Sequence, residues 1–170
     1  MIIIMATCNG AKTLPKVFEG YAKLAQPAGG WSAIVVDDGS DDETRSIVES
    51  YAKLLPIEYV RQERSGKNAA LNRGVELALQ RRPAAELCVM TDDDATPERE
   101  WLVAMQACML ENADYDLFGG AILPDWGAPP PDWVLRHVPL GLAFAITNFS
   151  DGPIQPGAIW GPNMAVRRNV

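Results

Sequence analysis

The sequence predicts an α/β domain in which helices flank a central, mostly parallel sheet. Two observations carry this prediction. Short runs rich in β-branched residues alternate with segments of helical period, and polar clusters follow several of the runs, as at the carboxyl edge of a parallel sheet. With 170 residues, of which 48% are hydrophobic, the chain can bury one sizeable core. We therefore expect a single domain.

The first half of the chain contains four predicted strands. They are expected at residues 2–6, 31–36, 57–60 and 87–91, because each is a short apolar run bounded by turn residues. Between the first two strands, a helix is predicted at residues 14–25. Apolar residues at helical spacing form its inner face, namely Leu14, Val17, Phe18, Tyr21 and Leu24.

Three more helices are predicted between residues 41 and 110. Asp41 or Asp42 can cap the first, which Pro56 ends, and its inner face carries Ile47, Val48, Tyr51 and Leu54. The second follows a polar loop at residues 61–66, and its inner face carries Leu71, Val75, Ala78 and Leu79. The third has Pro97 in its first turn and bears Trp101, Leu102, Met105 and Met109.

The pattern is weaker beyond Asp116. Residues 116–123 fit one strand or two short strands around Gly119 and Gly120. Residues 126–133 are predicted to be a rigid extended connector, because proline lacks the backbone donor and fixes φ. No dependable period is present from residue 140 onward. We therefore separate residues 1–120 from residues 121–170 within the single domain.

Composition and charge exclude several classes of protein. A net charge of -7 and a pI near 4.7 argue against nucleic acid as a partner, because a phosphate backbone needs clustered Lys and Arg. Three cysteines in or beside apolar runs give little support for disulfides and favour a reducing compartment. The apolar start has no basic leader. These features predict a cytoplasmic domain, which is compatible with an acceptor embedded in the inner face of the membrane.

Polar residues follow the predicted strands in four clusters, where ligands collect in an open parallel sheet. The clusters are Thr7-Cys8-Asn9-Gly10, Asp37-Asp38-Gly39-Ser40, Ser65-Gly66-Lys67-Asn68 and Asp92-Asp93-Asp94. Three adjacent carboxylates repel one another unless a cation compensates their charge. Mg²⁺ or Mn²⁺ would do so, since both prefer carboxylate and phosphate oxygens. Taken alone, the cluster fits an ordinary acidic loop equally well, with Asp94 as a helix cap.

The other clusters contain groups that suit a nucleotide. Asp37 or Asp38 can accept a hydrogen bond from a base or ribose, although an acidic turn with glycine is more often only a turn. Lys67 and Arg73 bracket a helix start, where backbone N–H groups favour a diphosphate. Each cation alone is more often a solvated surface residue. A neighbouring metal site shifts the balance toward phosphate binding, because a metal-bound diphosphate has oxygens left to pair.

Other chemistries have little support. His137 is the one histidine, so a His-based metal site or a Ser-His-Asp triad has a single candidate base. Zinc is improbable because no C-x-x-C pair occurs. The sequence has neither G-x-G-x-x-G nor G-x-x-x-x-G-K-[ST], which argues against dinucleotide and P-loop sites.

In their order and spacing the clusters resemble the family 2 glycosyltransferases, whose domain has the GT-A fold, a Rossmann-like nucleotide-sugar-binding fold. The resemblance extends along nearly the whole chain. It includes residues 66–74 and the late segment Gly161-Pro162-Asn163-Met164-Ala165. It implies an inverting, metal-dependent transfer from a nucleotide sugar, most often a UDP-sugar, to a glycan or lipid-linked acceptor. Residues 1–120 would then bind the donor, and residues 121–170 would connect to and begin the acceptor side.

The resemblance also assigns residues to the site. Asp92 and Asp94 match the two ends of the family's DxD motif and would hold Mn²⁺ or Mg²⁺, with Asp92 also suited to ribose. The remaining donor and acceptor contacts would come from Thr7, Asn9, Asp38, Lys67, Asn72, Asp93, Trp160 and Asn163. Trp160 could stack on a sugar ring or fill the core with equal weight. Cys8 departs from the family, which usually has an aromatic residue there.

The general base is not assigned. Family members carry it in an acidic pair after the Gly-x-Asn segment, so we expect it after Val170 and expect this chain to be incomplete at its carboxyl end. One alternative is a non-catalytic nucleotide-sugar-binding fragment. Another is a sugar nucleotidyltransferase, which ordinarily has a basic, Gly-rich loop after its first strand, where this chain has only Lys12.

Overall fold

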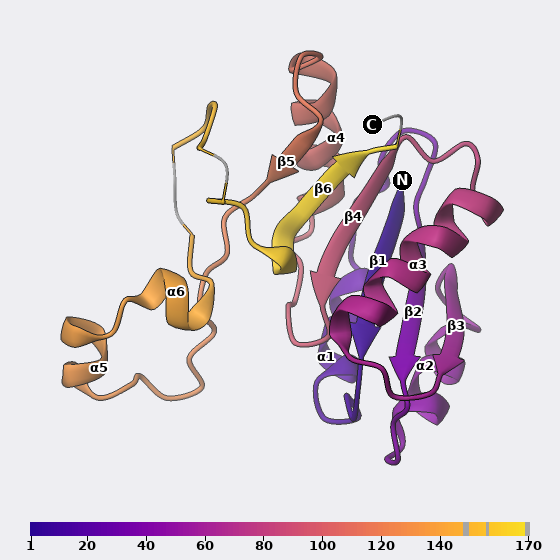
Figure 1. The fold of residues 1–170 in the computed structure, drawn as a ribbon, viewed down its shortest axis with the longest axis horizontal. Coiled ribbons are helices and arrows are strands. Elements are labelled where there is room, and N and C mark those ends of the chain that lie inside the picture. The colour runs from indigo at the N-terminus through magenta and orange to yellow at the C-terminus, as the bar shows by residue number, and fades with distance from the viewer. Residues whose placement is uncertain (148–149, 156, 169–170) are drawn as a thin grey trace.

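The computed structural model describes residues 1–147, 150–155 and 157–168. Its centre is a six-stranded sheet in the order β3-β2-β1-β4-β6-β5 (Figure 1). The four parallel strands are β1 (Ile2–Thr7), β2 (Ser32–Asp38), β3 (Ile57–Gln62) and β4 (Leu87–Asp92). β6 (Met164–Arg167) runs antiparallel to both of its neighbours, β4 and the short β5 (Leu117–Gly119). The predicted mostly parallel α/β sheet is confirmed.

One face of the sheet is covered by three helices. These are α1 (Leu14–Tyr21), α2 (Thr44–Tyr51) and α4 (Trp101–Glu111). Alternate strand residues such as Ile3, Met5 and Val35 pack with Phe18 and Leu102 in the larger core cluster. Because side chains alternate along a strand, their neighbours in sequence face the opposite side.

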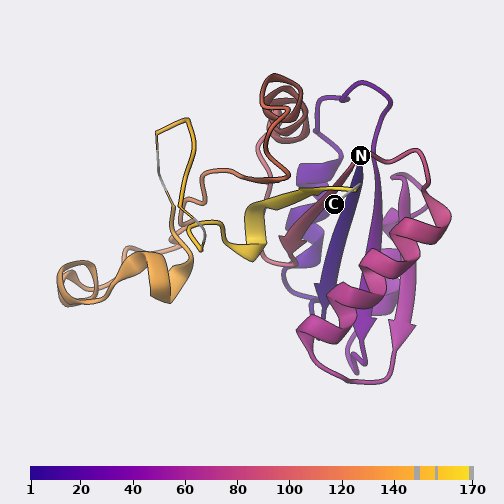
Figure 2. The same ribbon diagram turned by 45° about the horizontal axis from the view of Figure 1, so that its top comes forward.

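The opposite face is covered by α3 (Lys67–Arg81), which Figures 1 and 2 show in front of β1 and β2. Ile4 and Val36 pack there against the small residues Ala70 and Ala78. The helix lies so close to β1 that a Cβ on Gly74 would be 2.5 Å from Cγ2 of Ile4. The sheet is therefore buried on both faces, as the apolar strands predict.

Replacing Gly74 with alanine is expected to destabilise the protein. The added methyl group overpacks the α3–β1 contact, which costs about 1–3 kcal/mol, and this outweighs the ~1 kcal/mol that alanine contributes to a helix. Urea unfolding of the variant measures the difference. Gly127→Ala is the control, because its Cβ would meet no atom within 4 Å. An unchanged or higher free energy of unfolding in Gly74→Ala would contradict the close packing.

Several predicted boundaries and faces were wrong. The predicted helix at residues 14–25 ends at Tyr21, and the helix placed at Pro97 begins at Trp101 after a turn. Leu54 is 82% exposed because α2 ends three residues before it, and Leu79 is 42% exposed beside the inward Ala78. Asp42 does hold the start of α2, since its Oδ1 accepts hydrogen bonds from the N–H and the hydroxyl of Thr44.

The second half departs most from the prediction. The predicted connector at residues 126–133 is partly helical, because α5 (Asp132–His137) starts inside it. α6 (Leu140–Phe144), the 3₁₀ turn η1 (Gly161–Asn163) and β6 lie where no period was found. Residues 148–149, 156 and 169–170 of the predicted region 121–170 lie outside the described residues.

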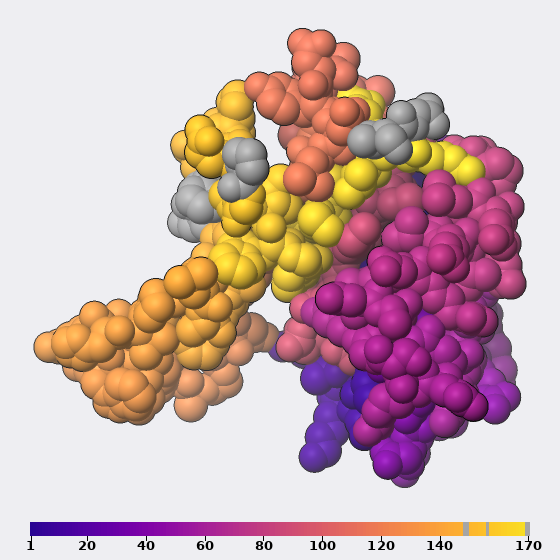
Figure 3. Space-filling view, in the orientation of Figure 1, coloured from indigo at the N-terminus to yellow at the C-terminus, as the bar shows by residue number. Residues whose placement is uncertain are grey.

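Residues 123–146, here called the arm, project from the body of the molecule and include α5 and α6 (Figure 3). The base of the arm is closed by an antiparallel bridge between Ile122 and Thr147. The Thr147 hydroxyl also donates to the carbonyl of Gly120. The arm is thus an excursion from the sheet rather than part of its core. None of the helices in the described part of the chain is long and apolar enough to cross a membrane.

Candidate functional site

The carboxyl ends of β1, β2 and β4 lie side by side. In the parallel register Thr7 stands opposite Asp37, and Ala6 stands opposite Asp92. The loops that follow these strands therefore leave the sheet at one edge. They contain three of the four predicted polar clusters, and the fourth begins α3 at the same edge, because α3 follows β3, which is parallel to β2.

Asp38 holds the loop that leads into α3. The residue as a whole is 4% exposed. Oδ1 accepts hydrogen bonds from the N–H of Ser65 and the side-chain amide of Gln62, and Oδ2 accepts one from the N–H of Gly66 at 2.8 Å. The bond from Gln62, followed by that from Ser65, lowers the pKa of Asp38. Asp38 is therefore an ionised anchor for the start of α3.

Gln62 was not among the predicted site residues. The third strand was predicted to end at Val60, but β3 extends to Gln62, so the amide reaches Asp38 at 2.7 Å. Its position in the predicted polar loop at residues 61–66, just beyond a strand, was the available signal. Beyond it lies a pocket of about 470 Å³, lined by Gly39, Arg61, Gln62, Glu63 and Arg64.

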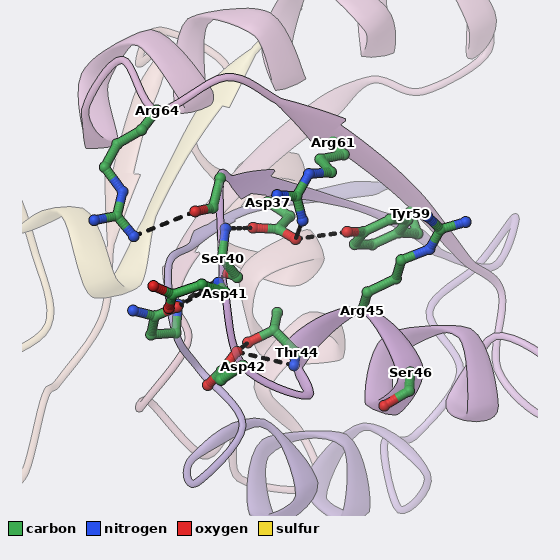
Figure 4. A network of polar contacts seen from close by, with 12 residues as sticks. Asp37, Ser40, Asp41, Asp42, Thr44, Arg45, Ser46, Tyr59, Arg61 and Arg64 are labelled. Atoms are coloured by element: carbon green, nitrogen blue, oxygen red, sulfur yellow. Dashed lines mark hydrogen bonds and ion pairs between the residues drawn. The ribbon is translucent and has the colours of Figure 1, made fainter.

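Asp37 faces the interior and forms a separate network (Figure 4). The side chain is fully buried. Its Oδ1 accepts from the N–H of Ser40, while Oδ2 accepts from the Tyr59 hydroxyl at 2.5 Å and lies 3.6 Å from Arg61. Burial, followed by the hydrogen bond to Asp37, raises the pKa of Tyr59 to about 12. Asp37 fixes the turn after β2.

The wild type is expected to lose stability relative to Tyr59→Phe above pH 10. The neutral phenol donates to Asp37 in the folded protein, so its pKa of about 12 exceeds the ordinary value of 10.0. This stabilising contribution is complete below pH 10 and disappears as pH rises toward 12. Denaturant unfolding of both proteins between pH 8 and 12 measures the difference. Parallel stability curves would contradict the prediction, since lysines titrate in both proteins.

Asn9 connects the loops after β1 and β2. It has a left-handed backbone, with φ of 58°, and is exposed. Its N–H donates to the Ser40 hydroxyl, and its Oδ1 accepts from the N–H of Asp41 at 3.0 Å. The N–H of Ala11 adds a bond to Asp42. These contacts fix the two loops relative to each other, and the predicted substrate contact of Asn9 stays a prediction.

The three adjacent carboxylates have different surroundings. Lys67 lies 2.6 Å from Asp92 Oδ1, and the Thr7 hydroxyl donates to Asp93 at 2.5 Å. Asp94 is exposed and has no hydrogen bond or ion pair within the described residues. Burial raises the pKa of Asp93, and the negative charges of Asp94 and Asp92 raise it further. The hydrogen bond from Thr7 lowers the pKa but does not offset this rise. Negative charge is therefore concentrated at this loop.

Gly10 is part of the same contact. A Cβ at Gly10 would lie 2.9 Å from Asp93 Oδ2 and would also meet the Thr7 hydroxyl. The loop after β1 therefore comes close to the acidic loop only because residue 10 has no side chain. Thr7 is paired with Asp93 and Lys67 with Asp92 Oδ1, so Asp94 is the carboxylate of the three that has no protein partner among the described residues, and Asp92 keeps its Oδ2.

These residues fit a hard divalent cation that a substrate also coordinates. Among residues 1–147, 150–155 and 157–168, no three His, Cys, Asp or Glu side chains are grouped so that they could hold a metal. Mg²⁺ and Mn²⁺ are commonly bound by one or two carboxylates together with substrate phosphates. The pair Asp92 and Asp94 supplies that number of ligands, and their oxygen chemistry suits either ion.

The remaining predicted residues lie around this edge or beyond it. Asn72 is exposed on α3, within two turns of Lys67. Trp160 is half-buried directly before η1. Asn163 ends η1, and its side-chain amide is paired with Trp101 and Ala121. Trp101 was predicted only as a core residue, so this contact was missed.

Comparisons with known proteins identify the family. The family model described as "Glycosyl transferase family 2" matches residues 2–170. A PGL/p-HBAD biosynthesis glycosyltransferase of Mycobacterium tuberculosis is 32% identical over 123 residues, which cover 71% of this chain and 46% of the relative. A glucosyl-dolichyl phosphate glucuronosyltransferase of Haloferax volcanii is 23% identical over 148 residues, or 86% of this chain and 46% of the relative. The chain thus spans about half the length of these relatives.

Solved structures share the fold. The mannosyltransferase PcManGT from Pyrobaculum calidifontis, in complex with GDP-Man and Mn²⁺, has a TM-score of 0.65 at 24% identity, covering 99% of this chain and 44% of that one. S. aureus TarS 1-349 in complex with UDP-GlcNAc has a TM-score of 0.66 at 24% identity, covering 79% of this chain and 38% of that one. The predicted GT-A fold is confirmed. With a family match along almost its whole length, the chain belongs to glycosyl transferase family 2.

Proposed function

We propose that this chain is the donor-binding part of a metal-dependent, inverting glycosyltransferase that takes its sugar from a UDP-linked donor. The observation that carries the proposal is the convergence of Asp38, Lys67 and the loop Asp92–Asp94 on one edge of the sheet. This edge offers an acceptor for a base or ribose, a cation for a diphosphate and carboxylates for a metal. A metal-bound nucleoside diphosphate can use all three kinds of group.

The nucleoside would lie near Asp38, with Thr7 and Asn9 in the adjacent loop. Lone pairs remain on the Asp38 carboxylate beyond its three internal bonds. The pocket beside Gln62 provides space for a ring at this end. Because Asp38 also anchors Ser65 and Gly66, binding at the base would be coupled to the position of α3.

The diphosphate would lie at the amino terminus of α3. The free N–H groups and the positive end of the helix dipole favour an anion there. Lys67 pairs with Asp92 at 2.6 Å, so its ammonium group is already placed between the helix and the acidic loop. Asn72 and Arg73, on the next turn, are further candidates for this end of the donor.

Asp94 and Asp92 would hold Mn²⁺ or Mg²⁺. When bound, the cation would offset the charge that develops on the leaving diphosphate. The protein's own contribution is to present two carboxylates while the Thr7 hydroxyl keeps Asp93 engaged. The Mn²⁺ named in the structure of PcManGT supports a divalent ion for this fold.

The acceptor side would lie along Trp160 and the arm, within residues 121–170. We propose a glycan or lipid-linked acceptor and a cytoplasmic enzyme that works at the inner face of the membrane. The arm supports this, since Trp133 is 62% exposed and Leu142 is 73% exposed, and the name of the Haloferax relative includes a dolichyl phosphate.

Co-sedimentation of the protein with lipid vesicles should fall in Trp133→Ser and in Leu142→Ser, because each substitution removes an exposed apolar side chain from the arm. Co-sedimentation equal to that of the wild type would contradict a membrane-facing arm.

Titration with nucleotides tests the donor site. UDP with Mn²⁺ should raise the melting temperature, and chelation with EDTA should remove most of the gain. Uridine, which lacks the diphosphate, serves as the matched ligand and should give a small, metal-independent shift. A larger shift in melting temperature with GDP than with UDP would show that the donor carries guanine rather than uracil. No shift with either nucleotide would contradict the proposed function.

A further inference from the structure

Asn163 lies where α4, β5 and η1 meet. The indole N–H of Trp101 donates to its Oδ1 at 2.9 Å, and its Nδ2 donates to the carbonyl of Ala121 at 3.0 Å. Its backbone N–H donates to the carbonyl of Trp160, and its carbonyl accepts from the N–H of Gly120. The backbone N–H, the backbone carbonyl, Oδ1 and Nδ2 of Asn163 therefore each have a partner within the protein, so the side-chain amide is held in one orientation before any ligand binds.

The end of β5 is shaped to receive this side chain. A Cβ on Gly120 would run into the side-chain amide of Asn163, and a Cβ on Gly119 would be 3.0 Å from Ile159. The two glycines let the chain after β5 approach η1 closely enough for both hydrogen bonds. Side chains at these positions would force η1 and the end of β5 apart.

This junction lies next to the acidic loop. β6 starts at Met164, which pairs with Met90 in β4, so Asn163 and η1 lie beside the end of β4, where the acidic loop begins. The rest of the acidic loop, residues 93–100, leads into α4, whose first residue is Trp101. The loop is thus held at one end by strand pairing and at the other by the Trp101–Asn163 hydrogen bond.

We propose that Asn163 is a positioning residue that acts through Trp101 on the loop carrying Asp92 and Asp94, and that it does not contact the donor. The side chain must accept from an indole and donate to a carbonyl at once, which an amide can do and a carboxylate or an alkyl group cannot. The consequence for metal-dependent nucleotide binding rests on the proposed function, whereas the effect on the loop does not.

Hydrogen exchange of the ligand-free protein tests the effect on the loop. Trp101→Phe keeps an aromatic side chain but removes the indole N–H together with one of the two fused rings, and Asn163→Ala removes the hydrogen-bond partner without changing residue 101. Each should accelerate amide exchange in residues 93–100 about 5-fold, the equivalent of one hydrogen bond. In the Trp101→Phe background, Asn163→Ala should add much less than it does alone. Asn112→Ala is the matched control, because the Asn112 side chain, directly after α4, donates to the carbonyl of Cys108 at the far end of that helix, and it should leave this exchange unchanged.

Nucleotide affinity separates positioning from direct contact. With saturating Mn²⁺, Trp101→Phe and Asn163→Ala should each weaken UDP binding, by about 5-fold, while affinity in EDTA stays the same. Weaker binding in Asn163→Ala alone would indicate direct contact and overturn the inference, as would unchanged loop exchange in both variants. If the wild type shows no Mn²⁺-dependent UDP binding while loop exchange follows the prediction, the proposed donor site is wrong and the positioning role is supported.

Discussion

Replacing Asp94 with alanine is expected to abolish the part of the nucleotide-dependent stabilisation that requires a divalent cation. At 100 times its Kd, a ligand that binds only the folded state adds about 2.7 kcal/mol to the free energy of unfolding. Asp94 is exposed and has no protein partner in the described part of the chain, so its oxygens are available to a cation. Thermal unfolding with UDP, in Mn²⁺ and in EDTA, measures the loss.

The ligand-free Asp94→Ala protein should be as stable as the wild type or slightly more stable. The charge of Asp94 contributes to the raised pKa of Asp93, and removing it relieves repulsion within the loop. Asp114→Ala is the matched control, because Asp114 is exposed in the turn after α4. An undiminished Mn²⁺-dependent gain in Asp94→Ala would show that Asp94 is not a metal ligand, whereas a ligand-free protein that melts early would show that it has a structural role.

The sequence predicted the first half of the fold well because the information there is local. Runs such as Ile2, Ile3 and Ile4 are apolar on both faces, which is typical of strands in a covered parallel sheet. The polar residues after them could be assigned to one edge because parallel strands end at the same side. The register that places Asp92 beside Ala6 and Asp37 beside Thr7 confirms that assignment.

The second half could not be predicted in the same way, because its structure depends on distant partners. β6 is four residues long and is a strand only through its pairing with β4 and β5. No period marks so short an element. The inner face predicted for α3 was wrong at Leu79 for a related reason. Leu79 fits an apolar stripe at helical spacing, but α3 packs on the sheet through Ala70, Gly74 and Ala78. Such small residues give little periodic signal in the sequence.

The candidate site shows the same division. The sequence located the acidic residues but not what each of them contacts. Asp37 and Asp38 are adjacent and identical in type, yet one is engaged by Tyr59 and the other by Gln62. Their side chains point to opposite faces of β2, and only the three-dimensional neighbours decide their roles. The pairing of Trp101 with Asn163 joins residues 62 positions apart and has no local signature.

Replacing Asp38 with asparagine is expected to weaken UDP binding by about 10- to 100-fold, the range for losing a hydrogen bond to a charged group. The new amide would present an N–H group toward either Gly66 or the donors on Ser65 and Gln62, so at least one internal bond is lost. Gly66 has φ of 96° directly before α3, and the displaced loop would carry Lys67 away from Asp92. Isothermal titration with UDP and Mn²⁺ measures the change.

The stability of the wild type relative to Asp38→Asn should depend on pH in the acid range. The folded protein lowers the pKa of Asp38 below its ordinary value of 3.8. The carboxylate therefore contributes stability above about pH 4, and this contribution disappears as the pH falls below that value and the group is protonated. Urea unfolding at pH 7 and at successively lower pH should show the two proteins converging.

Asp41→Asn is the matched control, because Asp41 is exposed in the same loop and its backbone N–H, rather than its side chain, donates to Oδ1 of Asn9. Its UDP affinity should equal that of the wild type. If Asp38→Asn is less stable but keeps its affinity, Asp38 is an anchor for the start of α3 and the base contact belongs to another residue. If Asp38→Asn lowers the affinity for UDP while amide hydrogen exchange of residues 63–67 is unchanged, Asp38 contacts the nucleoside directly. If the affinity falls and these amides also exchange faster, Asp38 both binds the nucleoside and anchors the start of α3.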